Sequence, residues 1–458
     1  MREKIAYGLG GLGGTLSSGS DDRLLLPVFV SLLHVSPALI SSFQLLYRLW
    51  DAVTDLLLGW MSDNTRSRWG RRRPYMLLGT VLLALFLPLF WLVNPEWSLT
   101  TIIIWMGVGQ LLLIAAGTIW NIPFQSLLFE FTPSSVERTN VAAVRSYVSK
   151  IGLFALGWIW WLTQLPIFNG ADGKPDILKG AFWISVVVGI IVLICGTTAA
   201  VVCRERYFKT IKKTETTGLW LNLKLTLSNR PFQLLAVILL FFTLGTTLNN
   251  SFTFYLRLYY VAGGDTQLAA TLSGWGSTVE LVTGFAAIPV IQWAARRYGK
   301  RASLIFVMSL VGLTGVSTLF TLNPDYPYLM LITNFIAAPT MTAIWILIPS
   351  ITSDIVDHEE LKSGVRREGA FAAVFSWLFK LAMSIATVFS GFIIVWSGFD
   401  AKLGADQAEG AMTNIRLILV LISAVTIPVA VAVCCYFPLT TRRIEEIRVE
   451  LEARRGEV

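Results

Sequence analysis

The sequence predicts an all-α protein that crosses a membrane many times. Apolar residues make up 54% of its 458 residues and charged residues only 14%, whereas soluble domains carry about 25% charged residues. Nearly charge-free runs recur along the chain, each with roughly the 20 residues that a helix needs to span a bilayer. Basic residues gather in alternate loops between these runs, which is typical of polytopic membrane proteins.

Twelve spans are expected, and each is justified by an apolar run that ends in a polar or proline-containing loop. The expected spans cover residues 4–32, 36–62, 74–94, 98–130, 139–167, 177–203, 231–261, 266–295, 301–322, 326–354, 367–397 and 411–437. The glycine-rich start, "GLGGLG", matches a dinucleotide-binding pattern by letters alone. Because no strand precedes it, we interpret these glycines as sites of close helix packing.

The loops divide into a basic set and a set with few basic residues. The basic set consists of Arg66–Arg73, Arg138, residues 204–230, Arg296–Arg301, Lys362–Arg367 and the C-terminal tail. The opposite set contains only Lys174, Lys179 and Lys402 as basic residues. The positive-inside rule therefore places both termini in the cytoplasm, which requires an even number of spans. The expected location is the plasma membrane, or the inner membrane of a Gram-negative bacterium.

The chain also shows signs of an internal duplication. "SRWGRRRP" resembles "RRYGKRAS", with Gly70 and Gly299 separated by 229 residues, and Pro123 and Pro349 mark a second similar pair separated by 226. We therefore expect a six-helix half over 1–203, a cytoplasmic loop over 204–230, a second half over 231–437 and a tail over 438–458. Two such halves around a midplane cavity describe a secondary transporter.

Other functional classes have little support in the sequence. The net charge of +8 lies mainly in loops between spans, so membrane topology explains it better than nucleic-acid binding. Four cysteines lack metal or disulfide spacing, and His34 and His358 are too few and too far apart for a metal site or catalytic triad. A cleaved signal peptide is not expected. We expect no enzyme activity, no cofactor and a monomer, with a membrane-embedded enzyme as the weaker alternative.

Two carboxylates in an apolar run are the most informative feature of the sequence. Asp51 and Asp55 lie four residues apart in "RLWDAVTDLLLGW", so a helix presents them on one face. A charged side chain at the bilayer centre costs about 2.5–3.5 kcal/mol, and two close carboxylates repel each other unless a cation lies between them. Hard oxygen ligands favour Na⁺ or a proton. The alternative is a structural polar face held by Arg48.

The segment "RLWDAVTDLLLGWMSDNTRSRWGRRRPY" resembles the signature of the glycoside–pentoside–hexuronide:cation symporters, the melibiose carrier's family within the major facilitator superfamily. The similarity continues through "TIWNIPFQSL", Arg145, "IWILIPSITSDIVDHEELKSGVRREGAF" and Lys380. It implies the twelve-helix major facilitator fold, and symport of a small solute with Na⁺, Li⁺ or H⁺ by alternating access. It also implies a cation site made of Asp51, Asp55, Thr54 and Thr118.

Several further residues are candidates for binding the solute. Lys380 lies deep in its expected span and is expected to balance the acidic site, unless it forms a structural ion pair. Arg145 is expected at the inner end of the cavity. Trp120 and Trp345 are candidates for an apolar platform against a sugar ring.

This chain departs from the melibiose carrier where that family holds the sugar. Thr15 and Asn121 occupy the positions of two sugar-binding carboxylates, and Gln125 replaces a stacking tryptophan. Asp22 lies two helical turns beyond Thr15 on the same face and either substitutes for a lost carboxylate or pairs with Arg23. The solute is therefore left open between a different glycoside, an acidic sugar, and a lysophospholipid or other non-sugar molecule.

Charged residues at the cytoplasmic ends of the spans are expected to form a gate or to fix the topology. Asp63 is expected to pair across the two halves when the inner side is closed, and residues around the tenth-to-eleventh loop are expected to do likewise. The complete set of gate candidates is Asp63, Arg71, Asp354, Asp357, Glu359, Arg366 and Arg367.

Overall fold

The structure is a computed structural model. It describes residues 2–65, 67, 69–131, 135–170, 173–203, 226–364, 368–408 and 410–455. The chain forms two compact helical units, and each is described separately. Unit 1 contains Met1–Lys213, Asp265–Thr278 and Asp400–Gly404, and unit 2 contains Thr214–Gly264, Val279–Phe399 and Ala405–Val458.

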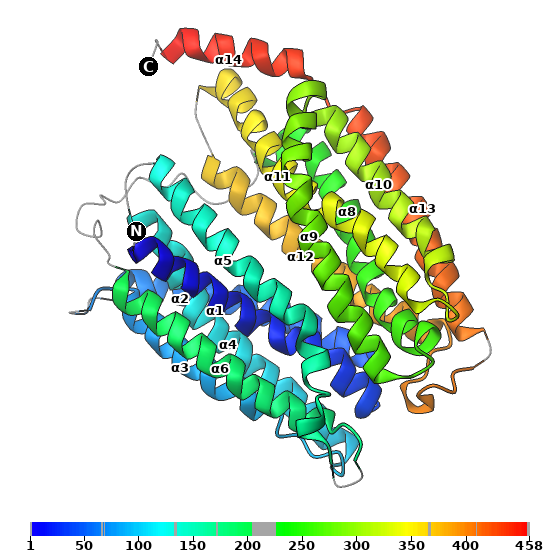
Figure 1. Ribbon diagram of the computed structural model, residues 1–458. Helices are drawn as coiled ribbons and strands as arrows, with labels where there is room; N and C mark the ends of the chain where they lie inside the picture. Colours follow the sequence, from blue (N-terminus) through cyan, green and yellow to red (C-terminus); the bar gives the residue numbers. More distant parts are fainter. Residues whose placement is uncertain are drawn as a thin grey trace. The chain divides into compact units, whose positions relative to one another are not determined.

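The first half of the chain supplies six long helices (Figure 1). They are α1 (Arg2–Leu25), α2 (Pro37–Asn64), α3 (Arg73–Phe90), α4 (Leu99–Phe131), α5 (Ser135–Leu162) and α6 (Ile177–Val202). A π-helix, η1 (Leu26–Leu32), follows α1 directly, and a 3₁₀ turn, η2 (Pro166–Phe168), lies between α5 and α6. α1 packs mainly on α5 and α6, and α3 packs on α4 and α6.

The described residues of the second half of the chain also form six long helices that follow one another from residue 230 to residue 435. They are α8 (Arg230–Tyr255), α9 (Thr266–Tyr298), α10 (Lys300–Thr321), α11 (Met330–Ser363), α12 (Glu368–Trp396) and α13 (Ala411–Cys435). Shorter elements are η3 (Leu256–Val261), η4 (Pro327–Leu329), η5 (Ala401–Leu403) and the tail helix α14 (Thr441–Arg455). Within the described residues, nine helical segments are long and apolar enough to cross a membrane. The predicted all-helical polytopic class is therefore confirmed.

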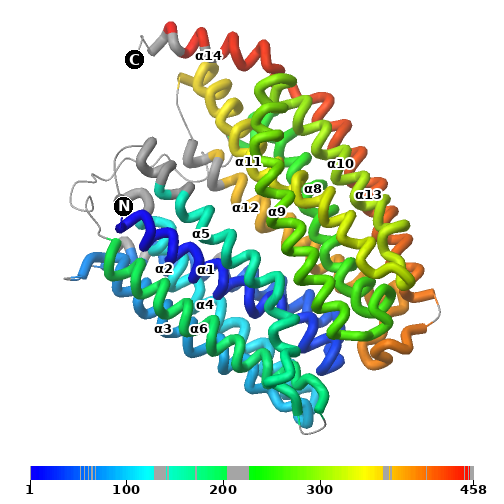
Figure 2. The backbone as a smooth tube through the Cα atoms, viewed as in Figure 1, coloured from blue at the N-terminus to red at the C-terminus, as the bar shows by residue number. Residues whose placement is uncertain are grey.

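Two arginines make similar contacts at the ends of α6 and α13. Arg73 donates to the carbonyl oxygens of Ala200 and Val201 and so caps the end of α6. Arg301, which lies 228 residues later, donates to the carbonyl oxygens of Cys434 and Cys435 at the end of α13. Basic side chains commonly satisfy the last carbonyls of a helix in this way. These contacts hold α3 beside α6 and α10 beside α13, the latter pair being visible in Figure 2.

The expected packing role of the N-terminal glycines is confirmed within unit 1. A Cβ atom at Gly10 would lie 2.8 Å from the Cβ of Ala199, and one at Gly13 would lie 3.3 Å from the Cβ of Cys195. Both partners are on α6, so the absence of side chains lets α1 and α6 approach closely.

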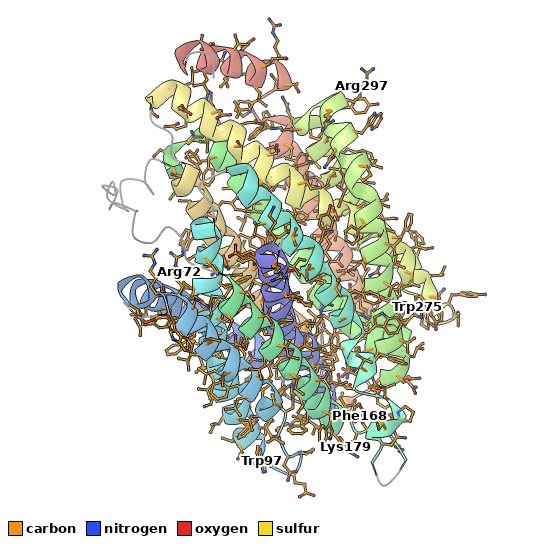
Figure 3. The ribbon with its side chains drawn as sticks, turned by 60° about the vertical axis from the view of Figure 1, so that its left-hand side comes forward. Arg72, Trp97, Phe168, Lys179, Trp275 and Arg297 are labelled. Atoms are coloured by element: carbon orange, nitrogen blue, oxygen red, sulfur yellow. The ribbon has the colours of Figure 1, made fainter. Side chains whose placement is uncertain are left out.

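Residues from opposite sets of loops lie at opposite ends of unit 1 (Figure 3). Arg72, from the basic loop, is at one end, and Trp97, Phe168 and Lys179 are at the other.

The division of the chain into units by contacts differs from the division expected from the sequence at two short segments, since residues 265–278 and 400–404 cluster with unit 1. Side-chain contacts reflect this: Gln164 Nε2 donates to the Thr266 carbonyl at 3.1 Å.

Candidate functional site

The expected cation site is built on α2 and α4 in unit 1. Thr118 Oγ1 of α4 lies 3.3 Å from Asp51 Oδ1 of α2. Thr54 Oγ1 lies 3.5 Å from Thr118 Oγ1 and donates to the Trp50 carbonyl one turn earlier on α2. Three of the four residues implied by the resemblance therefore meet, although Thr118 is 67 residues from Asp51 in sequence.

Burial makes this group of oxygens suitable for a small cation. The side chains of Thr54 and Thr118 are buried, with 9% and 3% exposed, and Asp51 is partly buried. Asp55 lies one turn after Asp51 on α2 and is also partly buried. Carboxylate and hydroxyl oxygens are hard ligands of the kind that Na⁺, Li⁺ and protons prefer, so the donor set fits a monovalent cation.

α4 also presents a polar face that begins beside the cation site. Asn121 and Gln125 are exposed and successive turns apart, and Gln125 Nε2 donates to Asn121 Oδ1 at 3.0 Å. Gly117, one turn before Asn121, has open space around the position that a Cβ would take. Positions 117, 121 and 125 therefore form a face on which a polar solute can rest.

Arg145 is held in place by aromatic rings of α1 and α4. Its guanidinium carbon lies 5.2 Å from the Phe124 ring centre and 6.0 Å from that of Tyr7. These two rings stack on each other at 4.4 Å. Cation–π contacts of this kind orient a guanidinium. Because Gly11 has no side chain, Arg145 Cγ can pass close beside α1.

The two tryptophans proposed as a sugar platform differ in the structure. Trp120 has only 3% of its surface exposed and stacks on Phe124 at 5.0 Å. Its ring faces the protein interior, so the structure does not present it as an open platform. Trp345 of α11 is 56% exposed and meets Phe379 edge to face at 5.3 Å. Lys380 is exposed on α12, in unit 2.

Near the end of α1 the structure separates two adjacent carboxylates. Asp22, the predicted solute-binding candidate, is exposed. Asp21 is instead partly buried, and its Oδ1 is shielded from solvent without a hydrogen-bond donor. Thr15 donates back to the Gly11 carbonyl at 2.9 Å. Asp21 was not among the predicted site residues, because the helical repeat places Asp22, seven residues after Thr15, on the same face as Thr15.

One gate candidate, Asp354, forms an ion pair with a residue of its own unit. Asp354 is almost fully buried, and its Oδ2 forms a 2.6 Å salt bridge with Lys300 Nζ. Both residues belong to unit 2, so this ion pair lies inside one unit, and pairing of Asp354 across the two halves stays a prediction. Glu359 likewise accepts from Asn229 of its own unit at 2.7 Å. Lys300 is the first residue of α10, and its side chain reaches Asp354 in the C-terminal half of α11.

The other gate candidates give less structural information. Arg71 and Asp357 are partly buried and have polar or charged partners. Arg366, Arg367 and the side chain of Asp63 lie outside the described residues. Their gating role stays a prediction.

Comparison with known proteins agrees with this geometry. The family described as "MFS/sugar transport protein" matches residues 6–441. A glucuronide carrier protein homolog of Escherichia coli (strain K12) is 25% identical, over 99% of this chain and 96% of the relative. The isoprimeverose transporter of Lactiplantibacillus pentosus is also 25% identical, over 87% of this chain and 81% of the relative.

More distant similarities extend over the whole chain as well. The sodium-dependent lysophosphatidylcholine symporter 1 of Xenopus tropicalis is 20% identical, over 98% of this chain and 89% of the relative. The crystal structure of the nucleoside transporter NupG matches with a TM-score of 0.64 and 13% identity, covering 96% of this chain and 100% of that one. The structural match shows the fold alone. With its helical units, its matched residues and these relatives, the chain belongs to the MFS/sugar transport family of the major facilitator superfamily, whose members are transporters and not enzymes.

Proposed function

We propose that this protein carries a glycoside or hexuronide into the cell together with a monovalent cation, by alternating access. The contact between Thr118 of α4 and Asp51 of α2 is the observation that carries the proposal. It closes an oxygen-lined group around a carboxylate inside a membrane helix, where an ionised side chain is costly without a counter-ion. Relatives named as carriers of a glucuronide and of isoprimeverose support a sugar as the solute.

The arrangement of unit 1 links the two binding events. Thr118 contacts the cation site, and Asn121 stands on the same helix three residues later. Binding of a cation at Asp51, Asp55, Thr54 and Thr118 fixes this part of α4 and thereby the polar face that receives the solute. Each ligand then increases the affinity for the other, as thermodynamic linkage requires.

Uptake by reconstituted protein tests this function. Proteoliposomes should accumulate a sugar of the right class against its gradient when Na⁺, Li⁺ or H⁺ flows inward. Efflux of preloaded sugar in the absence of any cation gradient is the control for passive leakage. If no imposed cation gradient changes sugar accumulation, coupling is disproved, and the protein is then a facilitator or an exchanger.

The residues of the solute face predict a preference among sugars. Asn121 and Gln125 each donate and accept hydrogen bonds, and Arg145 supplies positive charge. We expect a glucuronide to bind more tightly than melibiose. The carboxylate of a glucuronide can form a charged hydrogen bond that neutral melibiose cannot form. The absence of one such bond costs on the order of 1.5–3 kcal/mol, roughly tenfold to a hundredfold in affinity. Calorimetry with p-nitrophenyl glucuronide, isoprimeverose, melibiose and lysophosphatidylcholine would measure the order.

Each outcome of that comparison has a clear meaning. Tightest binding of melibiose would contradict the importance of Thr15, Asn121 and Gln125. Tightest binding of lysophosphatidylcholine would favour the lysophospholipid alternative, which the sodium-dependent relative makes the second candidate.

The proposed orientation places both termini and residues 204–230 in the cytoplasm of a plasma or inner membrane. A cysteine introduced at Lys213 should therefore resist an impermeant thiol reagent added to intact cells, and one introduced at Gly173, in an opposite loop, should react. Labelling at position 213 and not at position 173 would show that the orientation in the membrane is the opposite of the proposed one. The protein is proposed to act as a monomer, without nucleic acid.

A further inference from the structure

An unassigned carboxylate stands within a membrane helix of the second half of the chain. Glu280 is the fifteenth of the 33 residues of α9 and is exposed. Its Oε1 accepts a 2.8 Å hydrogen bond from Asn334 Nδ2 of α11. Within the described part of the chain, no basic side chain forms an ion pair with it. An exposed charge at such a depth requires contact with water or a polar ligand.

The lipid-facing side of α9 can be identified by its apolar exposed residues. Trp275, Val282 and Trp293 are 46%, 62% and 59% exposed. At about 100° per residue, Glu280 points about 160° away from Val282 and about 140° away from each tryptophan. Val290, which is 61% exposed, lies about 80° away and marks the edge of the apolar surface. The carboxylate therefore lies outside the surface suited to hydrocarbon.

The face that carries Glu280 is otherwise closed. Gly276, Gly284, Ala287 and Ile291 lie within about 40° of its direction and are buried. A Cβ at Gly284 would be 3.0 Å from Thr342 Oγ1 of α11, so α9 and α11 approach closely one turn beyond Glu280. Glu280 is thus an exposed acidic position one turn before this close approach of α9 to α11.

We propose that Glu280, oriented by Asn334, forms a subsite of unit 2 that accepts hydrogen bonds from the hydroxyl groups of the solute. This inference rests on the proposed sugar transport. The Asn334 amide occupies one oxygen of Glu280 and fixes its plane, which leaves Oε2 for a hydroxyl donor.

Accessibility provides a test that does not depend on knowing the solute. Glu280→Cys and the matched control Val282→Cys would be made in a Cys435→Ser background, since Cys195, Cys203 and Cys434 are buried. In nanodiscs, a charged impermeant methanethiosulfonate should react at position 280 and not at 282. p-Nitrophenyl glucuronide or isoprimeverose, whichever binds the parent protein, should slow the reaction at 280.

Affinity provides the second measurement. Glu280→Gln keeps the size of the side chain and an oxygen for Asn334, and it should weaken binding of the same sugar by about tenfold or more. Lack of reaction at 280, or unchanged sugar affinity in Glu280→Gln, would overturn the inference. If the parent protein itself binds no sugar, the proposed function fails instead, so the two failures are distinguishable.

Discussion

Asp51→Asn is expected to abolish cation-dependent solute accumulation while leaving the protein folded. Asparagine has nearly the same size as aspartate but no charge, so it cannot balance a bound cation. Asp55→Asn should have the same effect because both carboxylates are on one face of α2. The loss of one charged ligand costs on the order of 1.5–3 kcal/mol, which is roughly tenfold to a hundredfold or more in cation affinity.

Uptake in proteoliposomes, with and without a Na⁺ gradient, measures this effect, and thermal unfolding measures the folding. Na⁺ or Li⁺ should stabilise the wild type, since a ligand at 100 times its Kd contributes about 2.7 kcal/mol. Thr118→Ser, which retains the hydroxyl, is the matched control for Thr118→Val, which removes it. Unchanged Na⁺-dependent accumulation in both aspartate variants would disprove the site.

Gly79→Ala is expected to damage both the fold of unit 1 and its cation site. A Cβ at this position would lie 2.5 Å from the backbone nitrogen of Trp120 and 2.9 Å from its Cα. Because these are backbone atoms of α4, rotating a side chain cannot relieve the contact. α3 and α4 would have to separate, and overpacking of this kind typically costs about 1–3 kcal/mol.

Gly117→Ala is the matched control: Gly117 lies on α4, and nothing lies within 4 Å of the position that its Cβ would take. The melting temperature of detergent-purified protein should fall for Gly79→Ala and remain near wild type for Gly117→Ala. Cation stabilisation should weaken in parallel, because Trp120 is two residues from Thr118. Equal melting temperatures for the two variants would show that α3 and α4 do not require close contact at Gly79.

The salt bridge between Lys300 and Asp354 shows why the roles of charged residues at helix ends are hard to assign from sequence. Their sequence context identified Asp354 as a gate candidate and Lys300 as part of a topogenic cluster. The partner depends on where the start of α10 lies beside α11, and hydropathy does not specify this. The structure pairs them inside unit 2, so Asp354 contributes to holding α10 on α11.

The sequence by itself determined the helical membrane class, the order of the apolar segments, and the placement of Asp51 and Asp55 one turn apart on a single helix. Each of these depends on hydrophobic run length or on the helical repeat, which are local properties of the chain. The family resemblance added Thr118 to the cation site. Only the tertiary structure brought Thr118 to Asp51, enclosed Trp120 and Asp21, and set Glu280 beside Asn334. These contacts depend on the rotation and depth of one helix against another, which side-chain packing fixes and sequence periodicity does not.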